Sequence, residues 1–264
     1  RDFGGANVVK NLSDHHLPVD DPSKTFFTFD CNPGGCDQKY AANQHICRLY
    51  ARDHKIKIYD IDQGIGTHLA IDDGLITPGG TLVSTDSHAN ILGAIGAFGQ
   101  GMGDKDIAHA WAYGKVWFKV PPTVKIVLKG RPGQDASAKD ITLAMLRELG
   151  ANGLLGFAAE IYGDVVKELD LASRITISSM ATEMGGIVAL FPPNRQVLDY
   201  CSAVSGREVK GVFADADAVY HSTIEIDIDG LTPKASRPGH PEDVVDVASL
   251  AGTKIGSAFI GSCT

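Results

Sequence analysis

The sequence has no apolar run long enough to cross a membrane. No stretch approaches the roughly 18–20 apolar residues that a spanning helix needs, and no signal-peptide pattern is present. The 264 residues are 44% hydrophobic and 21% charged, which is ordinary for a globular protein. That length suffices for one large domain or two ordinary ones. The chain opens on Arg1 instead of methionine, which indicates a fragment or a missing start.

A basic cluster is also lacking. The 24 lysines and arginines are scattered and are outnumbered by 32 acidic residues, which gives a formal net charge of −8. Nucleic acids and anionic membranes attract proteins through positive charge. We therefore expect neither as a partner.

Cysteines are few and odd in number. The sequence contains five of them, at positions 31, 36, 47, 201 and 263. Secreted disulfide frameworks usually have an even number of cysteines in a shorter chain. We therefore predict free thiols and a reducing cytoplasm.

Two common cofactor and hydrolase motifs are missing. The glycine-rich stretches 64–66 and 99–103 do not complete G-x-G-x-x-G, and no Walker Gly-Lys-Ser/Thr occurs. No Gly-x-Ser-x-Gly elbow is found either. Nucleotide cofactors and serine-hydrolase chemistry are thus disfavoured.

Strand-like and helix-like segments alternate along the chain, which predicts an α/β fold with mainly parallel sheets in three-layer α/β/α domains. Ser137 is the expected N-cap of a helix with Asp140 at its third position and Gly150 at its end. Small residues at every third position of 93–99 predict a tightly packed helix. The remaining predicted elements are strands at 25–29, 56–59, 80–84 (buried) and 124–128, and a helix at 41–52.

Two boundaries divide the chain into three predicted domains. Pro121 and Pro122 end one segment before the strand at 124–128. Alternating isoleucines and acids after His221 predict a half-exposed strand, and the polar stretch 233–241 is interpreted as a connector. We therefore expect domains at 1–122, 123–222 and 223–264.

The clearest chemical signal is the stretch Thr85-Asp86-Ser87-His88, which follows a predicted strand. Parallel sheets present ligand chemistry at the carboxyl ends of their strands. Asp30 and Cys31 also follow a strand, so they take the same topological position. The alternative is an ordinary polar turn, since Asp and Ser are common turn formers.

Two further residues stand out. His68 follows a glycine-rich turn, and it is either a structural histidine or part of the site. Glu183 is a charge within a segment of small and apolar residues, and such a carboxylate needs a partner.

Several motifs together resemble the aconitase family, with most likeness to the large subunits of 3-isopropylmalate dehydratase and related hydro-lyases. The resemblance covers nearly the whole chain, and the motifs occur in the family's order. They lie at 85–88, 93–99, 180–186 (Met-Ala-Thr-Glu-Met-Gly-Gly) and 260–264 (Ile-Gly-Ser-Cys-Thr), supported by 115–121 and 237–241.

The resemblance implies a 4Fe–4S cluster held by three cysteines, with one iron left open as a Lewis acid. Cys263 matches the first cysteine ligand. The other two ligands normally form a Cys-x-x-Cys pair later in the sequence, so we expect them beyond Thr264. On this view the chain alone is inactive.

The resemblance also assigns roles to site residues. Asp86 and His88 would manage the proton on the leaving hydroxyl, and Ser87 would touch a substrate carboxylate. His68 matches a histidine beside the same site. Glu183 matches the carboxylate that orients these histidines and the iron-bound water.

Two positions depart from the family pattern. The family usually has Asp-His where this chain has Asp30-Cys31. A cysteine, with an ordinary pKa of about 8.5, is still able to donate a proton. Ser179, which we count among the substrate-binding residues, stands where many relatives carry asparagine.

The activity implied is reversible dehydration of a hydroxy di- or tricarboxylic acid. 3-Isopropylmalate is the leading substrate, with dimethylmalate, citrate or aconitate, and homocitrate or homoaconitate as alternatives. Carboxylate-binding arginines and a serine base would come from a small, swivelling-domain subunit or a later domain. Two other readings stay open. One is a metal-dependent hydrolase with His68, Asp86 and His88 around a divalent ion, and the other is a non-catalytic scaffold.

Overall fold

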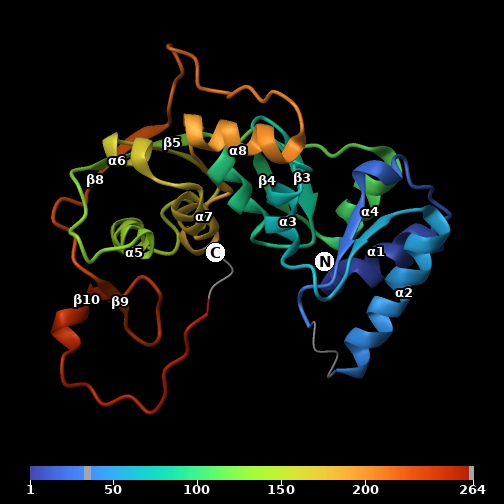
Figure 1. Ribbon diagram of the computed structural model, residues 1–264, viewed down its shortest axis with the longest axis horizontal. Helices are drawn as coiled ribbons and strands as arrows, with labels where there is room; N and C mark the ends of the chain where they lie inside the picture. The colour runs from blue at the N-terminus through green and yellow to red at the C-terminus, as the bar shows by residue number, and fades with distance from the viewer. Residues whose placement is uncertain (33–36, 262–264) are drawn as a thin grey trace. The chain divides into compact units, whose positions relative to one another are not determined.

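The computed structural model describes residues 1–32 and 37–261, which pack as two compact units (Figure 1). The first unit comprises Arg1–Leu75, Leu82–Ala89 and Gln100–Lys119. The second comprises Ile76–Thr81, Asn90–Gly99 and Val120–Thr264. In the described part of the chain, no helix is both long and apolar enough to span a membrane.

The first unit is built on a short parallel strand pair with helices around it. β1 (Phe26–Thr28) pairs with β2 (Lys57–Tyr59), and Phe27 lies opposite Ile58. Helix α1 packs against α2 and α4. The helices are α1 (Asp2–Asp14), α2 (Gln38–His54), α3 (Gly66–Asp72) and α4 (Asp104–Tyr113), with a short 3-10 turn η1 (Pro22–Lys24) before β1.

The helix predicted at 41–52 is confirmed within α2. The Asp37 carboxylate accepts a hydrogen bond from the Lys39 amide at 2.7 Å and caps its start. Cys47 and Ala51 face the core, where they meet Phe27 and Phe29. The helix therefore contributes to the core of the first unit beside β1.

The segment around the predicted strand at 80–84 differs from expectation. β3 (Thr81–Ser84) forms, but its residues are half-exposed or exposed, and among the described residues it pairs only with β4 (Phe98–Gly101). Residues 93–99 do not form the predicted helix. The chain makes a 3-10 helix, η2 (Ala89–Ile95), and then enters β4.

Close packing explains why this segment contains small residues although it does not form the predicted helix. A Cβ at Gly93 would collide with the carbonyl oxygen of Ala189, so the glycine allows backbone to lie on backbone. Gly96 then turns the chain with a φ of +73°, a value that favours glycine. The small residues here allow two backbone segments to approach closely and the chain to turn, and they do not form a long helix.

The second unit contains a four-stranded parallel sheet in the order β7-β6-β5-β8. Its strands are β5 (Thr123–Lys129), β6 (Ala158–Tyr162), β7 (Val188–Leu190) and β8 (Ser222–Asp227). Its helices are α5 (Ala138–Leu149), α6 (Asp164–Glu168), α7 (Leu171–Ser179) and α8 (Arg195–Ser205), with 3-10 turns η3 (Thr182–Met184) and η4 (Val247–Leu250). The α/β fold with mainly parallel sheets is confirmed.

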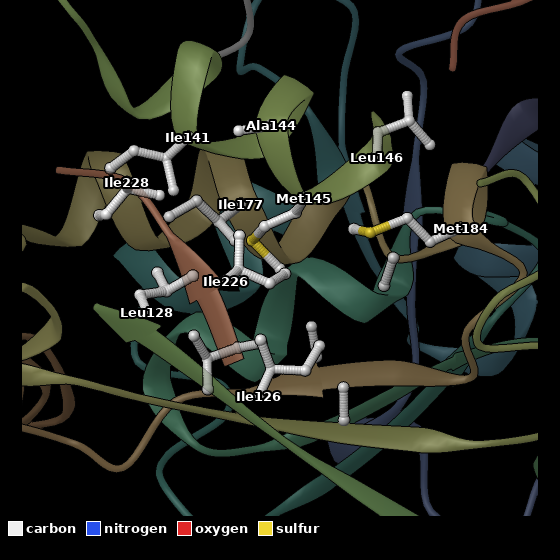
Figure 2. Close-up of a cluster of buried hydrophobic side chains, with 14 of the residues drawn as sticks. Ile126, Leu128, Ile141, Ala144, Met145, Leu146, Ile177, Met184, Ile226 and Ile228 are labelled. Carbon is white, nitrogen blue, oxygen red and sulfur yellow. The ribbon is translucent and has the colours of Figure 1, made fainter. Parts of the chain in front are cut away.

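Alternate residues of the central strands form the core of this unit. Figure 2 shows Ile126 and Leu128 of β5 beside Ile226 of β8, with Met145 of α5 and Ile177 of α7 packed on them. The alternation predicted after His221 is confirmed, because Ile226 is buried while its neighbours Glu225 and Asp227 are exposed.

The sequence also predicted both ends of α5 correctly. The Ser137 and Asp140 side chains form the expected capping box, and Gly150 ends the helix with a φ of +68°. Asp140 has a second role that the sequence did not reveal, since its carboxylate accepts a hydrogen bond from the Lys234 amide at 2.6 Å.

The connector predicted at 233–241 is wrong in part. β9 (Lys234–Ser236) pairs antiparallel with β10 (Val244–Asp246). Arg237 and Asp243 close the turn between them with hydrogen bonds of 2.6 and 2.8 Å. The stretch 233–241 thus contains the first strand of a hairpin and most of its turn. The division into three domains stays a prediction.

Candidate active site

Asp30 lies two residues after the end of β1, and its carboxylate is held from two sides. Oδ2 accepts a hydrogen bond from the Gly66 amide at 2.7 Å, and Oδ1 accepts one from Arg1 Nε at 2.8 Å. The side chain is only 1% exposed. Burial raises the pKa of Asp30, but the Gly66 amide and the Arg1 guanidinium outweigh it, so the pKa lies below its ordinary value. Asp30 is therefore a carboxylate at neutral pH.

The glycine-rich turn before α3 brings the Gly66 amide to Asp30. A Cβ at Gly66 would lie 2.5 Å from Oγ1 of Thr28, so no larger residue fits against β1. The glycine-rich turn at 64–66 therefore binds a carboxylate of the protein itself, through the Gly66 amide. In the sequence, this stretch was compared with phosphate-binding loops and did not complete their motif.

Asp86 occupies the equivalent position after β3. Its carboxylate is 3% exposed, accepts a hydrogen bond from the His88 amide at 3.0 Å, and pairs with Arg1 Nη1 at 2.8 Å. The Ser87 hydroxyl lies 3.2 Å from Nδ1 of His88. The structure thus brings the Asp-Ser-His motif and Asp30 to the same arginine.

Glycines also allow β4 to approach this motif. A Cβ at Gly101 would lie 2.6 Å from the Asp86 carbonyl oxygen and 2.9 Å from Cα of Ser87. The second glycine-rich stretch, 99–103, therefore has a packing function beside the candidate site.

Asp2 anchors the backbone next to Asp30. Its buried carboxylate accepts hydrogen bonds from the Cys31 amide at 3.1 Å and from Nε2 of Gln44 at 2.9 Å. Sequence reasoning missed Arg1, Asp2 and Gly66. No local pattern marks Arg1 or Asp2, because their partners lie in other elements.

Cys31 is half-buried, and its sulfur lies 3.7 Å from Oδ1 of Asp30. Burial and the neighbouring Asp2 raise the pKa of the Cys31 thiol to about 12, against the opposing effect of Arg1. The side chain therefore stays protonated at neutral pH. It is suited to donate a hydrogen bond, and unsuited to act as a thiolate.

His68 lies in the first turn of α3. Within residues 1–32 and 37–261, neither of its buried ring nitrogens has a hydrogen-bond partner. Burial lowers the pKa of His68, and the charges of Asp72 and Asp86 only partly oppose this. A neutral imidazole without partners is available to a substrate or to a residue from outside the described part.

The other predicted residues lie elsewhere in the chain. Ser179 ends α7, and its hydroxyl donates to the Thr176 carbonyl oxygen at 2.9 Å. Glu183 is half-buried in η3 of the second unit. Its predicted hydrogen bond with His68 or His88 stays a prediction. Cys263 lies outside the described residues.

One group in the first unit has the spacing of metal ligands. Ligand atoms of Asp2, Asp30 and Cys31 lie within 4.8 Å of one another. Of the residues the structure describes, His68, Asp86 and His88 do not form such a group. The arrangement does not favour a cation at Asp2, Asp30 and Cys31, because Arg1 already supplies positive charge there and the thiol is protonated.

The chain matches the Aconitase family (aconitate hydratase) model over residues 2–260. It is 34% identical over 265 residues to 3-isopropylmalate dehydratase large subunit 1 of Methanopyrus kandleri, which covers 100% of this chain and 63% of the relative. It is 36% identical over 245 residues to a probable methanogen homoaconitase large subunit of Methanothermobacter thermautotrophicus, covering 92% and 57%. The homoaconitase large subunit of Thermus thermophilus is 34% identical over 244 residues, again covering 92% and 57%.

These matches extend over nearly all of the chain, which in turn spans 57–63% of the length of these three relatives. The motifs at 85–88 and 180–186 lie inside the matched region. The chain belongs to the aconitase family.

Proposed function

We propose that this protein is a hydro-lyase that reversibly removes water from a small hydroxy di- or tricarboxylic acid. The observation that carries the proposal is the pair of buried carboxylates, Asp30 and Asp86, held at strand ends beside a neutral histidine and a protonated thiol. Reversible dehydration needs groups that give up and take back a proton at the leaving hydroxyl. Family membership supports the same activity.

Each residue has a proposed task. Asp86 and His88 handle the proton on the leaving hydroxyl, and Ser87 binds a substrate carboxylate. His68 presents a neutral ring nitrogen to the same group. Asp30 fixes the loop at Cys31 through its bonds to Arg1 and Gly66. Glu183 orients the histidines, and Ser179 binds substrate.

3-Isopropylmalate is the substrate we propose first, because relatives of similar identity are named as its dehydratase. Homocitrate, the hydroxy acid that gives homoaconitate on loss of water, follows, since other relatives are named homoaconitase. Dimethylmalate and citrate are the remaining candidates. A net charge of −8 does not attract a di- or tricarboxylate, so we propose that a small subunit or a later domain supplies arginines and the serine base.

The decisive experiment assays the complete large subunit together with its small subunit under anaerobic conditions. Each of the four hydroxy acids is offered in turn, and formation of the unsaturated acid is followed by its absorbance. Turnover of one substrate supports the proposal. The hydrolase alternative would instead give activity that depends on zinc or manganese, and a scaffold would give no turnover.

A 4Fe–4S cluster is the cofactor we propose for the complete protein. When bound, it would supply a Lewis acid for the departing hydroxide. The cysteines that the structure describes do not fit this role. Cys31, Cys47 and Cys201 are separate free thiols, and burial raises the pKa of each. The proposal rests on Cys263 and on cysteines of the rest of the protein.

The 264-residue chain alone should therefore fail to retain a full cluster. Anaerobic reconstitution with iron and sulfide, followed by desalting and iron analysis, tests this, with the complete protein as the positive control. A stable content of about four irons per chain in the short form would contradict the prediction.

Cys31 is proposed as a proton donor in place of the usual histidine. In the complete protein, Cys31→Ala should lower kcat by about 10²-fold, near the low end for general acids, because a thiol pKa of about 12 is poorly matched to neutral pH. Cys31→His should retain or raise kcat. The control is Cys47→Ala, which removes a thiol buried in the core of the same unit. If Cys31→Ala turns over normally, the thiol is packing.

We also propose that the protein works in the cytoplasm. None of the cysteines at 31, 47 and 201, the three in the described ranges, forms a disulfide. Nothing in the charge distribution favours nucleic acid or membrane as a partner.

A further inference from the structure

We propose that Arg1 is a positioning residue that holds Asp30 and Asp86 together as a pair of carboxylates. The inference rests on the proposed hydro-lyase function for its catalytic consequence. Its geometric basis is independent of that function, because it concerns only the guanidinium and the two acids.

The guanidinium contacts both carboxylates at hydrogen-bond distance. Nε of Arg1 lies 2.8 Å from Oδ1 of Asp30, and Nη1 lies 2.8 Å from Oδ1 of Asp86. The two acid side chains are 1% and 3% exposed, and that of Arg1 is 25% exposed. The arginine is thus a bridge between two buried charges that follow different strands.

Two buried acids near one another disfavour each other's negative charge. Arg1 supplies a cation with a planar fork whose donors point in fixed directions. The burial of Asp30 would raise its pKa, and Arg1 is one of the groups that bring it below the ordinary value.

The start of α1 fixes Arg1 itself. Its carbonyl oxygen accepts a hydrogen bond from the Gly5 amide at 2.9 Å. The next residue, Asp2, is fully buried and is held by Cys31 and Gln44. The guanidinium therefore reaches the two carboxylates from a rigid position.

This arrangement gives Asp30 a different role from the groups that transfer a proton. With Arg1 in place, Asp30 accepts hydrogen bonds and orients its loop, and Cys31, His68, Asp86 and His88 remain for proton transfer. Removing the guanidinium would let Asp30 take up a proton at higher pH and would weaken the hold on the loop that carries Cys31.

The test compares Arg1→Met and Arg1→Lys in the complete protein with its small subunit. Arg1→Met should lower kcat by about 10²-fold or more and affect KM less, because the arginine positions other groups. The acidic limb of the kcat–pH profile should move to higher pH by at least about one unit, since Asp30 loses a cation that depresses its pKa. Arg1→Lys should restore part of both effects, because it returns the charge without the fork.

Arg48→Met is the matched control. Arg48 also binds an acid that follows a strand, Asp60, with bonds of 2.6 and 3.3 Å, but this pair is about 40% exposed. The control should leave kcat and its pH profile close to those of the unchanged protein.

A second measurement tests the inference without an activity assay. The carboxyl group of Asp30 is titrated by ¹³C NMR in protein labelled at aspartate, and Asp30→Asn assigns its signal. A higher titration midpoint of Asp30 in Arg1→Met than in the unchanged protein supports the inference. This holds even if no hydroxy acid is turned over, and in that case only the proposed function fails. An unchanged midpoint and an unchanged pH profile, with merely a lower melting temperature, would overturn it.

Discussion

Replacing Asp30 by asparagine should lower kcat of the complete protein by about 10²-fold, because Asp30 orients the loop that carries Cys31 and a small misplacement of a reacting group has an effect of that size. The amide keeps the shape of the side chain but removes its negative charge. The amide oxygen can accept from either Arg1 or Gly66, so its NH2 group would face the other of these two donors. Initial rates over a range of substrate concentration separate kcat from KM.

Asp60→Asn provides the comparison. Asp60 follows β2 as Asp30 follows β1, and its carboxylate also binds an arginine and a backbone amide, with Ile61 N at 2.8 Å. Because Asp60 is 43% exposed, its loss should change kcat less than about twofold. Equal effects of the two substitutions would show that Asp30 has no special role.

Arg174→Met should lower the free energy of unfolding by roughly 3–5 kcal/mol, the largest stability effect we expect from a single substitution here. Arg174 is 1% exposed in α7. Its guanidinium donates to the carbonyl oxygens of Leu169 at 3.1 Å, Pro192 at 2.9 Å and Val166 at 2.7 Å.

The reason is the number of buried groups that would lose their partners. Burial lowers the pKa of Arg174 to about 10, so the side chain is still charged at neutral pH. No carboxylate of the described ranges pairs with it, and its donors go to backbone carbonyls at the end of α6 and after β7. Methionine would fill the space but leave those carbonyls without donors.

Urea unfolding of the variant measures the loss, and Thr176→Ala serves as the control in the same helix. The Thr176 hydroxyl donates only to the Ala172 carbonyl oxygen one turn earlier, at 3.0 Å, so its removal should cost less than about 1 kcal/mol. A loss for Arg174→Met as small as that of the control would mean that water replaces the guanidinium.

Local signals predicted those parts of the fold that local forces decide. The capping box at Ser137 and Asp140, the glycine at 150 and the alternation around Ile226 each act within a few residues, and each is confirmed. The hairpin of β9 and β10 and the 3-10 helix η2 were missed. The hairpin is joined to α5 by the hydrogen bond from the Lys234 amide to Asp140, and η2 depends on the close approach of Gly93 to Ala189; composition reveals neither contact.

The same distinction applies to the candidate site. Asp30 and Asp86 were found because each follows a strand, and strand ends are recognisable in sequence. Arg1 was missed because it is separated by 29 residues from Asp30, with a helix and a strand between them. The amide of Gly66 comes from 36 residues beyond Asp30, and a backbone donor leaves no signature except the glycine itself.

The raised pKa of the thiols bears on how this protein responds to oxidants and alkylating reagents. Both react with the thiolate form, and at neutral pH Cys31 and Cys47, with pKa values of about 12, supply almost none of it. Burial raises the pKa of Cys201 as well. Rapid labelling or inactivation by a thiol reagent would thus report on cysteines other than these three, and Cys31 would react in a slow phase that quickens at alkaline pH.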